Sequence, residues 1–302
     1  MLEAEKWFKE KIKDMVWMQF QAMGGHLDGT MIGGDEENGT YKFPTFGRFD
    51  TYELTGAIQP VQGSNAEMDI VSIAPRDFEA SAWWRRQDIY KMGPNMQAAM
   101  ARALTMAIRR RRDWIKIEAL HKFTAATATQ DIGGAALLPD PILFEQGRAE
   151  IAATGADDMD IGGVFCPVPE MWMSQLCLYE EWKNAKFRGA DNLPWSKAMR
   201  EKAKTVRGVH YFTMPDEMFL SDDGGTSIIT HMWAHTALGA ETPLSQELPS
   251  ITQHADREGS PWLMKNWVSG CAVGIQRPAV KKIRFKKLTA LERIPILIDD
   301  GS

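Results

Sequence analysis

Residues 94–123 are PNMQAAMARALTMAIRRRRDWIKIEALHKF, a segment in which apolar residues recur three and four positions apart. Pairs such as Ala103-Leu104 and Ala107-Ile108 follow this spacing, which is typical of one stripe along a helix. Pro94 falls in the first turn, where its missing N–H leaves no helical hydrogen bond unmade. At about 1.5 Å per residue the helix would be roughly 40 Å long. We therefore expect a structural spine.

Four consecutive arginines lie inside this predicted helix: Arg109, Arg110, Arg111 and Arg112. Consecutive helical residues point about 100° apart, so the four side chains cannot form one basic face. At least one of them must meet the apolar stripe or a partner carboxylate. The run is compatible with a solvated surface, with ion pairs between subunits, or with contact to nucleic acid. The first two interpretations are favoured over the third.

The segment before the helix, residues 33–74, is divided by Gly and Pro into short runs such as 52–55 and 68–73. Asn38-Gly39 is a signal for a two-residue hairpin turn. Because the segment has few large aliphatic residues, we expect an extended loop that leans on a neighbour. Residues 1–23 are predicted to form an amphipathic helix that docks on another surface, since it would be marginal alone in water.

Mixed helix and strand patterns follow the spine. Residues 124–160 are rich in Ala, Thr, Gly and Asp, which predicts a connector. A turn at Pro169-Glu170 is expected to open a helix that continues to about Trp182. Strands are predicted at 164–168, 208–212 and 227–234, with a final strand pair at 268–275 and 280–285.

Composition excludes several classes of protein. The chain has 302 residues, of which 44% are hydrophobic and 25% charged, so it can bury a sizeable core. A net charge of −5 argues against a dedicated nucleic-acid binder. No apolar run is long enough for a membrane span or a signal peptide. Three widely spaced cysteines indicate neither a disulfide framework nor a zinc ribbon.

The strongest candidate for metal chemistry is the HxxxH spacing of His231 and His235. Zinc hydrolases carry this spacing on a helix, with a Glu directly after the first His. Here the neighbours are β-branched and aromatic and that Glu is absent, so a strand is favoured. Phosphate-binding loops and nucleophile elbows are absent, and each acidic pair, such as Asp157-Asp158, Asp222-Asp223 or Asp299-Asp300, lies in a turn-like or terminal stretch. We predict no catalytic residue, no metal ligand and no cofactor.

The order of these segments resembles the major capsid proteins of tailed bacteriophages with the Hong Kong 97-type fold. The resemblance covers nearly the whole chain and is carried by these segments in order: IVSIAPRDFEA at 70–80, the charged run 85–88, the spine from Pro94, FCP at 165–167, HTALGA at 235–240, SGCAVG at 269–274 and VKKI at 280–283. Each motif has low specificity on its own, and the resemblance depends on the order in which the motifs follow one another. Residues 184–205, which include Trp195, have no clear counterpart.

The resemblance implies an α+β fold with five parts. They are an N-terminal arm at 1–32, an extended loop at 33–74, a peripheral domain at 75–139 with the spine helix at 94–123, an axial domain at 140–275, and a C-terminal strand at 276–302 that returns to the peripheral domain. Subunit-interface candidates are Trp7, Phe8, Asp35, Glu36, Glu37, Tyr41, Phe43, Phe46, Arg109, Arg110, Arg111 and Arg112.

The resemblance also implies partners. The main partner is the chain itself, in the hexamers and pentamers of an icosahedral shell, with double-stranded DNA contacted non-specifically inside. The sequence starts directly in the N-terminal helix, which implies a separate scaffolding protein or none, and the first is favoured. A portal protein and decoration proteins are further expected partners. The implied location is the virion capsid, assembled in the host cytoplasm and without a membrane.

Alternative functions remain open from sequence. The same fold would serve a cellular encapsulin-type nanocompartment that packages an enzyme. A tail-tube or decoration subunit would lack the long spine helix. A further alternative is a zinc-dependent hydrolase in which His231, His235 and a distant carboxylate bind the metal. Stoichiometric zinc in the purified protein would favour this alternative.

Overall fold

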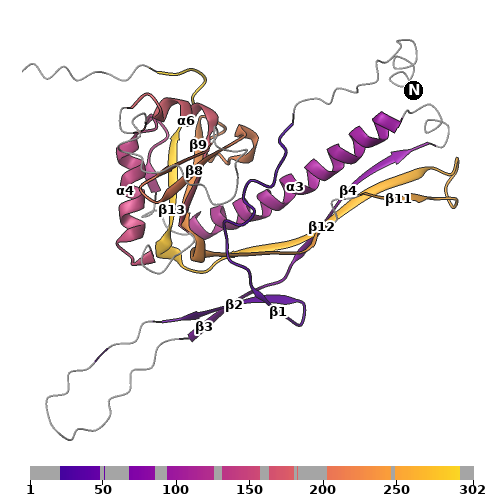
Figure 1. Cartoon of the computed structure of the whole chain (residues 1–302), viewed down its shortest axis with the longest axis horizontal. Helices are drawn as coiled ribbons and strands as arrows, with labels where there is room; N and C mark the ends of the chain where they lie inside the picture. The colour runs from indigo at the N-terminus through magenta and orange to yellow at the C-terminus, as the bar shows by residue number, and fades with distance from the viewer. Residues whose placement is uncertain are drawn as a thin grey trace, which may run out of the picture.

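The computed structural model describes the following residues: 21–47, 51, 68–85, 94–125, 131–156, 163–179, 182, 203–245 and 249–292. Figure 1 shows a body of sheet and short helices, from which the long helix α3 (Pro94–Ala125) and a ribbon of strands extend to one side. A small third sheet lies below the junction of these two parts.

A six-stranded mixed sheet forms the centre of the body. Its strands, in spatial order, are β5 (Asp131–Gly133), β13 (Val280–Lys286), β9 (Ser227–Ala234), β6 (Val164–Pro169), β8 (Val209–Met214) and β7 (Ala203–Val206). Every residue of β6 and β9 is buried, so both faces of the sheet are covered. The helix α4 (Pro141–Ala152) packs against β5, β9 and β13, and α6 (Glu170–Leu176) packs against β6 and β8.

The ribbon is a second sheet built around the long strand β12 (Trp262–Gly274). On one edge, residues 262–270 of β12 pair with β4 (Arg76–Trp84). On the other edge β12 pairs with β11 (Ser250–Gln253) and then β10 (Leu238–Ser245). The helix α3 packs along β12, and its last turns also enter the core of the body through Ile117 and Leu120. The helix therefore joins the two parts.

The third sheet consists of β1 (Asp35–Glu37), β2 (Thr40–Phe46) and β3 (Met68–Ile73), in that order. Asn38 and Gly39 connect β1 to β2 with φ angles of 53° and 75°. Two positive φ values in a two-residue loop define the hairpin turn that Asn-Gly favours. The predicted hairpin and the predicted strand at 68–73 are both confirmed.

The side chain of Phe43 packs the third sheet against the ribbon. The ring is 2% exposed and packs with Tyr41 and Cys271 in a small hydrophobic cluster of its own. A Cβ at Gly239 would lie 2.2 Å from the ring, so glycine at this position leaves room for the ring to fit. The sheet is thus held against β10 and β12 by the buried rings of Phe43 and Tyr41, and Ile32, just before β1, makes backbone hydrogen bonds with β10.

Most other predicted elements are present. The spine helix and the strands at 164–168, 208–212 and 227–234 are confirmed within a few residues. The connector at 124–160 is wrong, because Asp140 caps the N-terminus of α4 and Pro141 starts it. The helix after Pro169 ends at Leu176, so the predicted extension to Trp182 is also wrong. The described residues also contain the single-turn 3₁₀ helices η2 (Asp216–Met218), η3 (His235–Ala237) and η4 (Arg277–Ala279).

One expectation about the C-terminal half is corrected. The strands at 268–275 and 280–285 do not pair, since β12 belongs to the ribbon and β13 to the six-stranded sheet. β13 pairs with β9 and with β5, which lies within the predicted peripheral domain 75–139, and the return of residues 276–302 to that domain stays a prediction. Strands β10 and β11 pair with β12, along which α3 packs.

Several predictions fall outside the described residues: residues 1–20 of the predicted helix 1–23, with Trp7 and Phe8; the run at 52–55; the acidic pairs at 157–158 and 299–300; and residues 184–202 of the segment 184–205, with Trp195. Within the part of the chain that is described, no helix is both long and apolar enough to cross a membrane.

Replacing Phe43 by Ala should loosen the third sheet. Removing a buried Phe side chain costs about 3–5 kcal/mol, and we expect this loss locally, as faster amide exchange in β2 and β3 than in β6. Phe46→Ala is the matched control, since Phe46 lies on the same strand and is 69% exposed. Equal exchange in the two variants would contradict the anchoring role of Phe43.

Candidate subunit interfaces

The third sheet carries an exposed apolar face. In the antiparallel register Phe46 lies opposite Met68, and Pro44 lies opposite Ile70. Opposite residues share a face, as do residues two apart on one strand. The side chains of Phe46, Met68 and Ile70 are 69%, 71% and 58% exposed. The four residues are called the β2–β3 face below.

The predicted interface residues of this region separate into two groups. Tyr41 and Phe43 are buried against β10 and β12 within the chain, so little of their surface is left for a neighbouring subunit. This corrects their assignment as interface candidates. Phe46 is exposed on the β2–β3 face. Sequence patterns missed Met68 and Ile70, because the run MDIVSI shows no clean alternation of polar and apolar residues.

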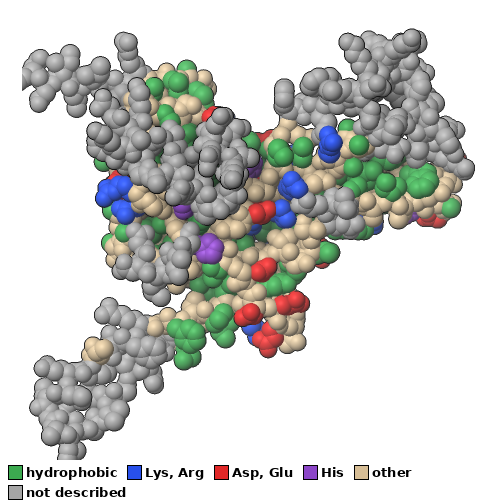
Figure 2. Space-filling model, in the orientation of Figure 1, with side chains coloured by type: hydrophobic (Ala, Val, Ile, Leu, Met, Phe, Trp, Pro, Cys, Tyr) green, Lys and Arg blue, Asp and Glu red, His purple; other side chains and the backbone are tan. Residues whose placement is uncertain are grey.

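An acidic edge borders the same sheet. Asp35, Glu36 and Glu37 form the whole of β1 and are all exposed. Figure 2 shows acidic side chains gathered at this place. Glu37 forms an ion pair with Lys42, and Tyr41 donates a hydrogen bond to Glu36 across 3.4 Å. The strand is a short, charged sheet edge, which disfavours uncontrolled pairing with other chains.

The arginine run is used largely within the chain. Arg112 and Asp28 form an ion pair of 2.5 Å, and Arg111 pairs with Glu118 at 3.5 Å. The guanidinium of Arg111 also lies 3.9 Å from the ring centre of Phe78, in cation–π geometry. Of the open interpretations, ion pairing is therefore realised for two arginines, but with carboxylates of the same chain.

The remaining two arginines lie beside the segment before β1. Arg110 donates hydrogen bonds to the side chain of Gln21 and to the carbonyl of Ala22, at 2.9 and 2.8 Å. Asp28 is partly buried, which would raise its pKa, but Lys116, Arg112 and Arg109 together lower it. The predicted subunit-interface role of the run stays a prediction for the exposed parts of Arg109 and Arg110.

Asp113 holds the segment before β1 against α3. Its carboxylate is fully buried and accepts the backbone N–H groups of His26 and Leu27, at 3.0 and 3.2 Å. Burial raises the pKa of Asp113, against these two hydrogen bonds and Lys116, which lower it. Lys116 itself donates to the carbonyl of Leu27 at 3.0 Å. The segment is thus part of the folded chain and not a free arm from residue 26 onward.

The tip of the ribbon presents aromatic and charged groups. Trp83 is 44% exposed, with the guanidinium of Arg257 4.4 Å from its ring centre and the ring of His254 at 5.1 Å. Ile251 of β11 is exposed on the other side of β12 from β4. Aromatic residues and arginine are the types enriched in protein interfaces, so this tip is a second candidate surface.

The HxxxH pair does not form a metal site. His231 lies in β9, buried, with Nε2 3.2 Å from Thr124 Oγ1 of α3, whereas His235 lies beyond the strand in η3. No cluster of three or more His, Cys, Asp or Glu side chains suited to a metal exists among the described residues. Burial lowers the pKa of His231 to about 3, and the neighbouring His121 is the second-largest cause of this shift.

The acidic pair at 222–223 forms ion pairs within the body. Asp222 lies 3.1 Å from Lys282, and Asp223 lies 2.8 Å from Arg284. Hydrogen bonds from Thr226, Ser227 and Ser221 hold the pKa of Asp223 well below its usual range. These carboxylates therefore tie the turn before β9 to β13, and they do not form a paired-carboxylate active site.

Comparisons with known proteins agree with this architecture. The family model described as phage capsid protein matches residues 4–287. Among solved structures, the capsid of Ralstonia phage GP4 is 10% identical, with a TM-score of 0.66, and the match covers 94% of this chain and 96% of that one. The mature capsid of bacteriophage PhiM1 is 13% identical, with a TM-score of 0.59 and 92% of each chain covered. The cyanophage Pam1 capsid is 8% identical, with a TM-score of 0.64, covering 93% and 97%. The comparison with curated proteins finds no match.

The chain belongs to the phage capsid protein family, because the family model covers nearly all of it. Its fold is the α+β Hong Kong 97-type fold, and its role is that of a major capsid protein, a structural protein of the virion. The encapsulin, tail-tube, decoration and zinc-hydrolase alternatives are not favoured.

His231 makes stability depend on pH. The folded chain keeps His231 neutral, whereas the unfolded chain binds a proton with a pKa near 6.5. The stabilisation from His231 is therefore complete above about pH 6.5 and is lost as the pH falls toward 3, by up to about 1.4 kcal/mol per pH unit. Urea unfolding of His231→Gln should show a flatter pH dependence between pH 6 and 4 than wild type. His254→Gln, at a partly exposed position, should keep the wild-type slope; a wild-type slope in His231→Gln would contradict the account.

Asp113→Ala should release the segment that Asp113 holds. The N–H of Leu27 is buried, and leaving a buried donor unpaired costs roughly 1–3 kcal/mol. We expect faster amide exchange at His26 and Leu27 and a lower free energy of unfolding. Asp256→Ala is the control, because the Asp256 side chain is 74% exposed. Unchanged exchange at both amides in Asp113→Ala would show that other contacts hold the segment.

Proposed function

We propose that this chain builds a closed icosahedral shell of hexamers and pentamers around the double-stranded DNA genome of a tailed phage. Membership of the phage capsid protein family supports this proposal. Each copy would use one set of surfaces to contact a different set on its neighbour. Such head-to-tail contacts close into rings when the rotation between copies closes.

The observation that carries the proposal is the β2–β3 face. The opposite side of the same sheet is buried through Phe43, so the sheet is firmly placed, yet Phe46, Met68 and Ile70 remain exposed together. Contiguous exposed apolar groups mark protein-binding surfaces. A rigidly held apolar face that the described part of its own chain leaves uncovered is suited to contact a neighbouring subunit.

The parts of the fold then take roles in the shell. The ribbon with α3 would be the peripheral domain, and the body with the six-stranded sheet would be the axial domain, whose tips meet at capsomer centres. Residues 33–74 would be the extended loop that lies over a neighbour. Candidate interface residues are Trp7, Phe8, Asp35, Glu36, Glu37, Phe46, Arg109 and Arg110, to which the structure adds Met68 and Ile70.

Further partners belong to the same proposal. A separate scaffolding protein, a portal protein and decoration proteins would act on the shell, and packaged DNA would be contacted non-specifically. Assembly would take place in the host cytoplasm. The chain would act as a structural subunit without catalytic activity and without a cofactor.

Negative-stain electron microscopy of the purified protein, with mass photometry alongside, tests the proposal. We expect closed shells, capsomer rings, or regular sheets and tubes. A stable monomer near 34.0 kDa, unchanged by concentration or crowding, would overturn the proposal.

The variant Phe46→Ser/Ile70→Ser should assemble poorly while folding normally. Both side chains are exposed in the single chain, so their loss should change monomer stability by less than about 0.5 kcal/mol. The fraction of protein in shells, measured by sedimentation, should fall strongly. Ile142→Ser, at an exposed position of α4, is the control and should assemble as wild type. Normal assembly of the double variant would remove the β2–β3 face from the interfaces.

A further inference from the structure

The chain is held at a fixed point after its last strand. Gln175 of α6 is fully buried and uses both ends of its amide on the backbone of Glu292: Nε2 donates to the Glu292 carbonyl at 2.9 Å, and the Glu292 N–H donates to Oε1 at 3.0 Å. The Glu292 carboxylate also pairs with Lys286 at 2.6 Å. A buried amide committed to one backbone position fixes where the following residues leave the body.

The residues that follow are unusually apolar. Residues 293–302 are Arg-Ile-Pro-Ile-Leu-Ile-Asp-Asp-Gly-Ser, with four large aliphatic side chains and a proline in the five positions 294–298. In an extended chain, alternate residues share a face, so Ile294, Ile296 and Ile298 would form one apolar edge. Placed in water, such a run would be unfavourable, and a surface that covers it would stabilise it.

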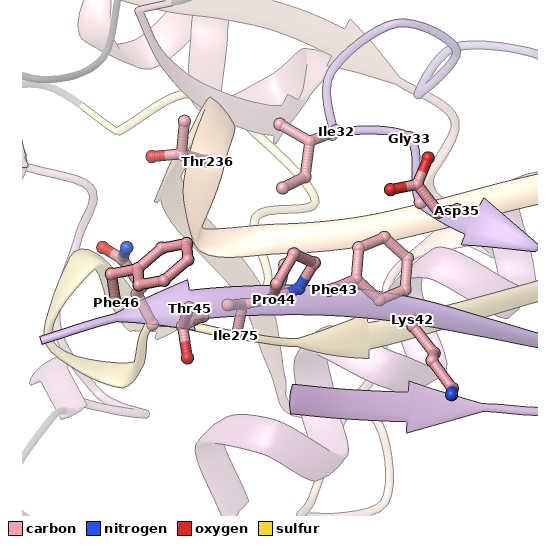
Figure 3. Close-up of a pocket in the computed structure, with 12 residues that line it drawn as sticks. Ile32, Gly33, Asp35, Lys42, Phe43, Pro44, Thr45, Phe46, Thr236 and Ile275 are labelled. Atoms are coloured by element: carbon pink, nitrogen blue, oxygen red, sulfur yellow. The ribbon is translucent and has the colours of Figure 1, made fainter. Parts of the chain in front are cut away.

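The β2–β3 face matches this run in chemistry and in length. Figure 3 shows the cavity next to it, of about 310 Å³, between β2 and the residues Ile32, Thr236 and Ile275. Alternate residues of β2 from Phe46 through Pro44 to Lys42 lie on this side of the sheet and extend over four residue steps, as does the run from Ile294 to Ile298. An extended segment laid along β2 would therefore cover the apolar residues of the face.

The same chain cannot supply this segment to its own face. The cavity is lined by Ile275 and Gln276, which precede β13, whereas Glu292 is fixed beyond the other end of β13. The seven residues of β13 extend for about 20 Å at ~3.3 Å per residue. Six residues from Glu292 to Ile298 reach at most about 20 Å, so Ile294 and Ile296 would stop short of the face.

We propose that residues 293–302 of one copy dock along the β2–β3 face of a second copy, with Ile294–Ile298 on the apolar residues. This inference rests on the proposed function, in that it names what covers the face in the assembled shell. Each copy both gives a segment and receives one, so the contact links copies in series.

Cysteine cross-linking tests the docking in the full-length chain. Ile70→Cys/Ile296→Cys should form disulfide-linked dimers and longer ladders under mild oxidation, because Ile296 would face Ile70 and a disulfide needs Cα atoms within about 7 Å. Ile251→Cys/Ile296→Cys is the matched control, since Ile251 is also an exposed strand residue but lies on the ribbon. We expect a cross-linked fraction roughly tenfold above this control and above Ile296→Cys alone, given the same distance requirement.

The outcomes separate the two proposals. Equal cross-linking in the test pair and the control overturns the docking, as does a test pair that joins only within one chain. Shells that form without the 70–296 cross-link overturn the docking and leave the proposed function intact. A wild-type chain that stays a monomer at every concentration overturns the proposed function, while a 70–296 cross-link between copies of the oxidised variant still supports the docking.

Discussion

Phe123 of α3 packs where Gly274 of β12 has no side chain; a Cβ at position 274 would lie 2.2 Å from its ring. This close approach fixes the long helix along the strand, and most of the architecture depends on it. The N-terminal part of α3 lies on the ribbon, its last turns enter the core of the body, and Asp113 between them holds the segment before β1. One helix thus sets the relative placement of three parts of the chain.

The remaining part, the sheet of β1 to β3, is placed by two buried aromatic side chains, Phe43 and Tyr41. Because Phe43 occupies a site made by Gly239 and the cluster around Cys271, the sheet projects in a defined direction and its other face stays exposed. Preorganised surfaces bind with less loss of conformational entropy. A subunit that must join many identical neighbours benefits from offering such a surface before any neighbour arrives.

The sequence predicted helices, strands and turns well where each depends only on neighbouring residues. The period of residues 94–123, the Asn38-Gly39 turn and the apolar run of β9 each depend on local chemistry. Pairing between distant segments was not predictable in this way. The sequence suggested that β13 pairs with β12, whereas β13 lies between β5 and β9. Tyr41 and Phe43 resemble interface aromatics in sequence, and only the tertiary contact with Cys271 shows that they are buried.

A cryo-electron microscopy reconstruction of the assembled particle tests the central claim most directly, because it places every copy relative to its neighbours. The account predicts a closed shell in which Phe46, Met68 and Ile70 of each copy are buried by another copy. A closed shell in which these three side chains remain exposed to solvent would contradict the account of how the subunits are joined.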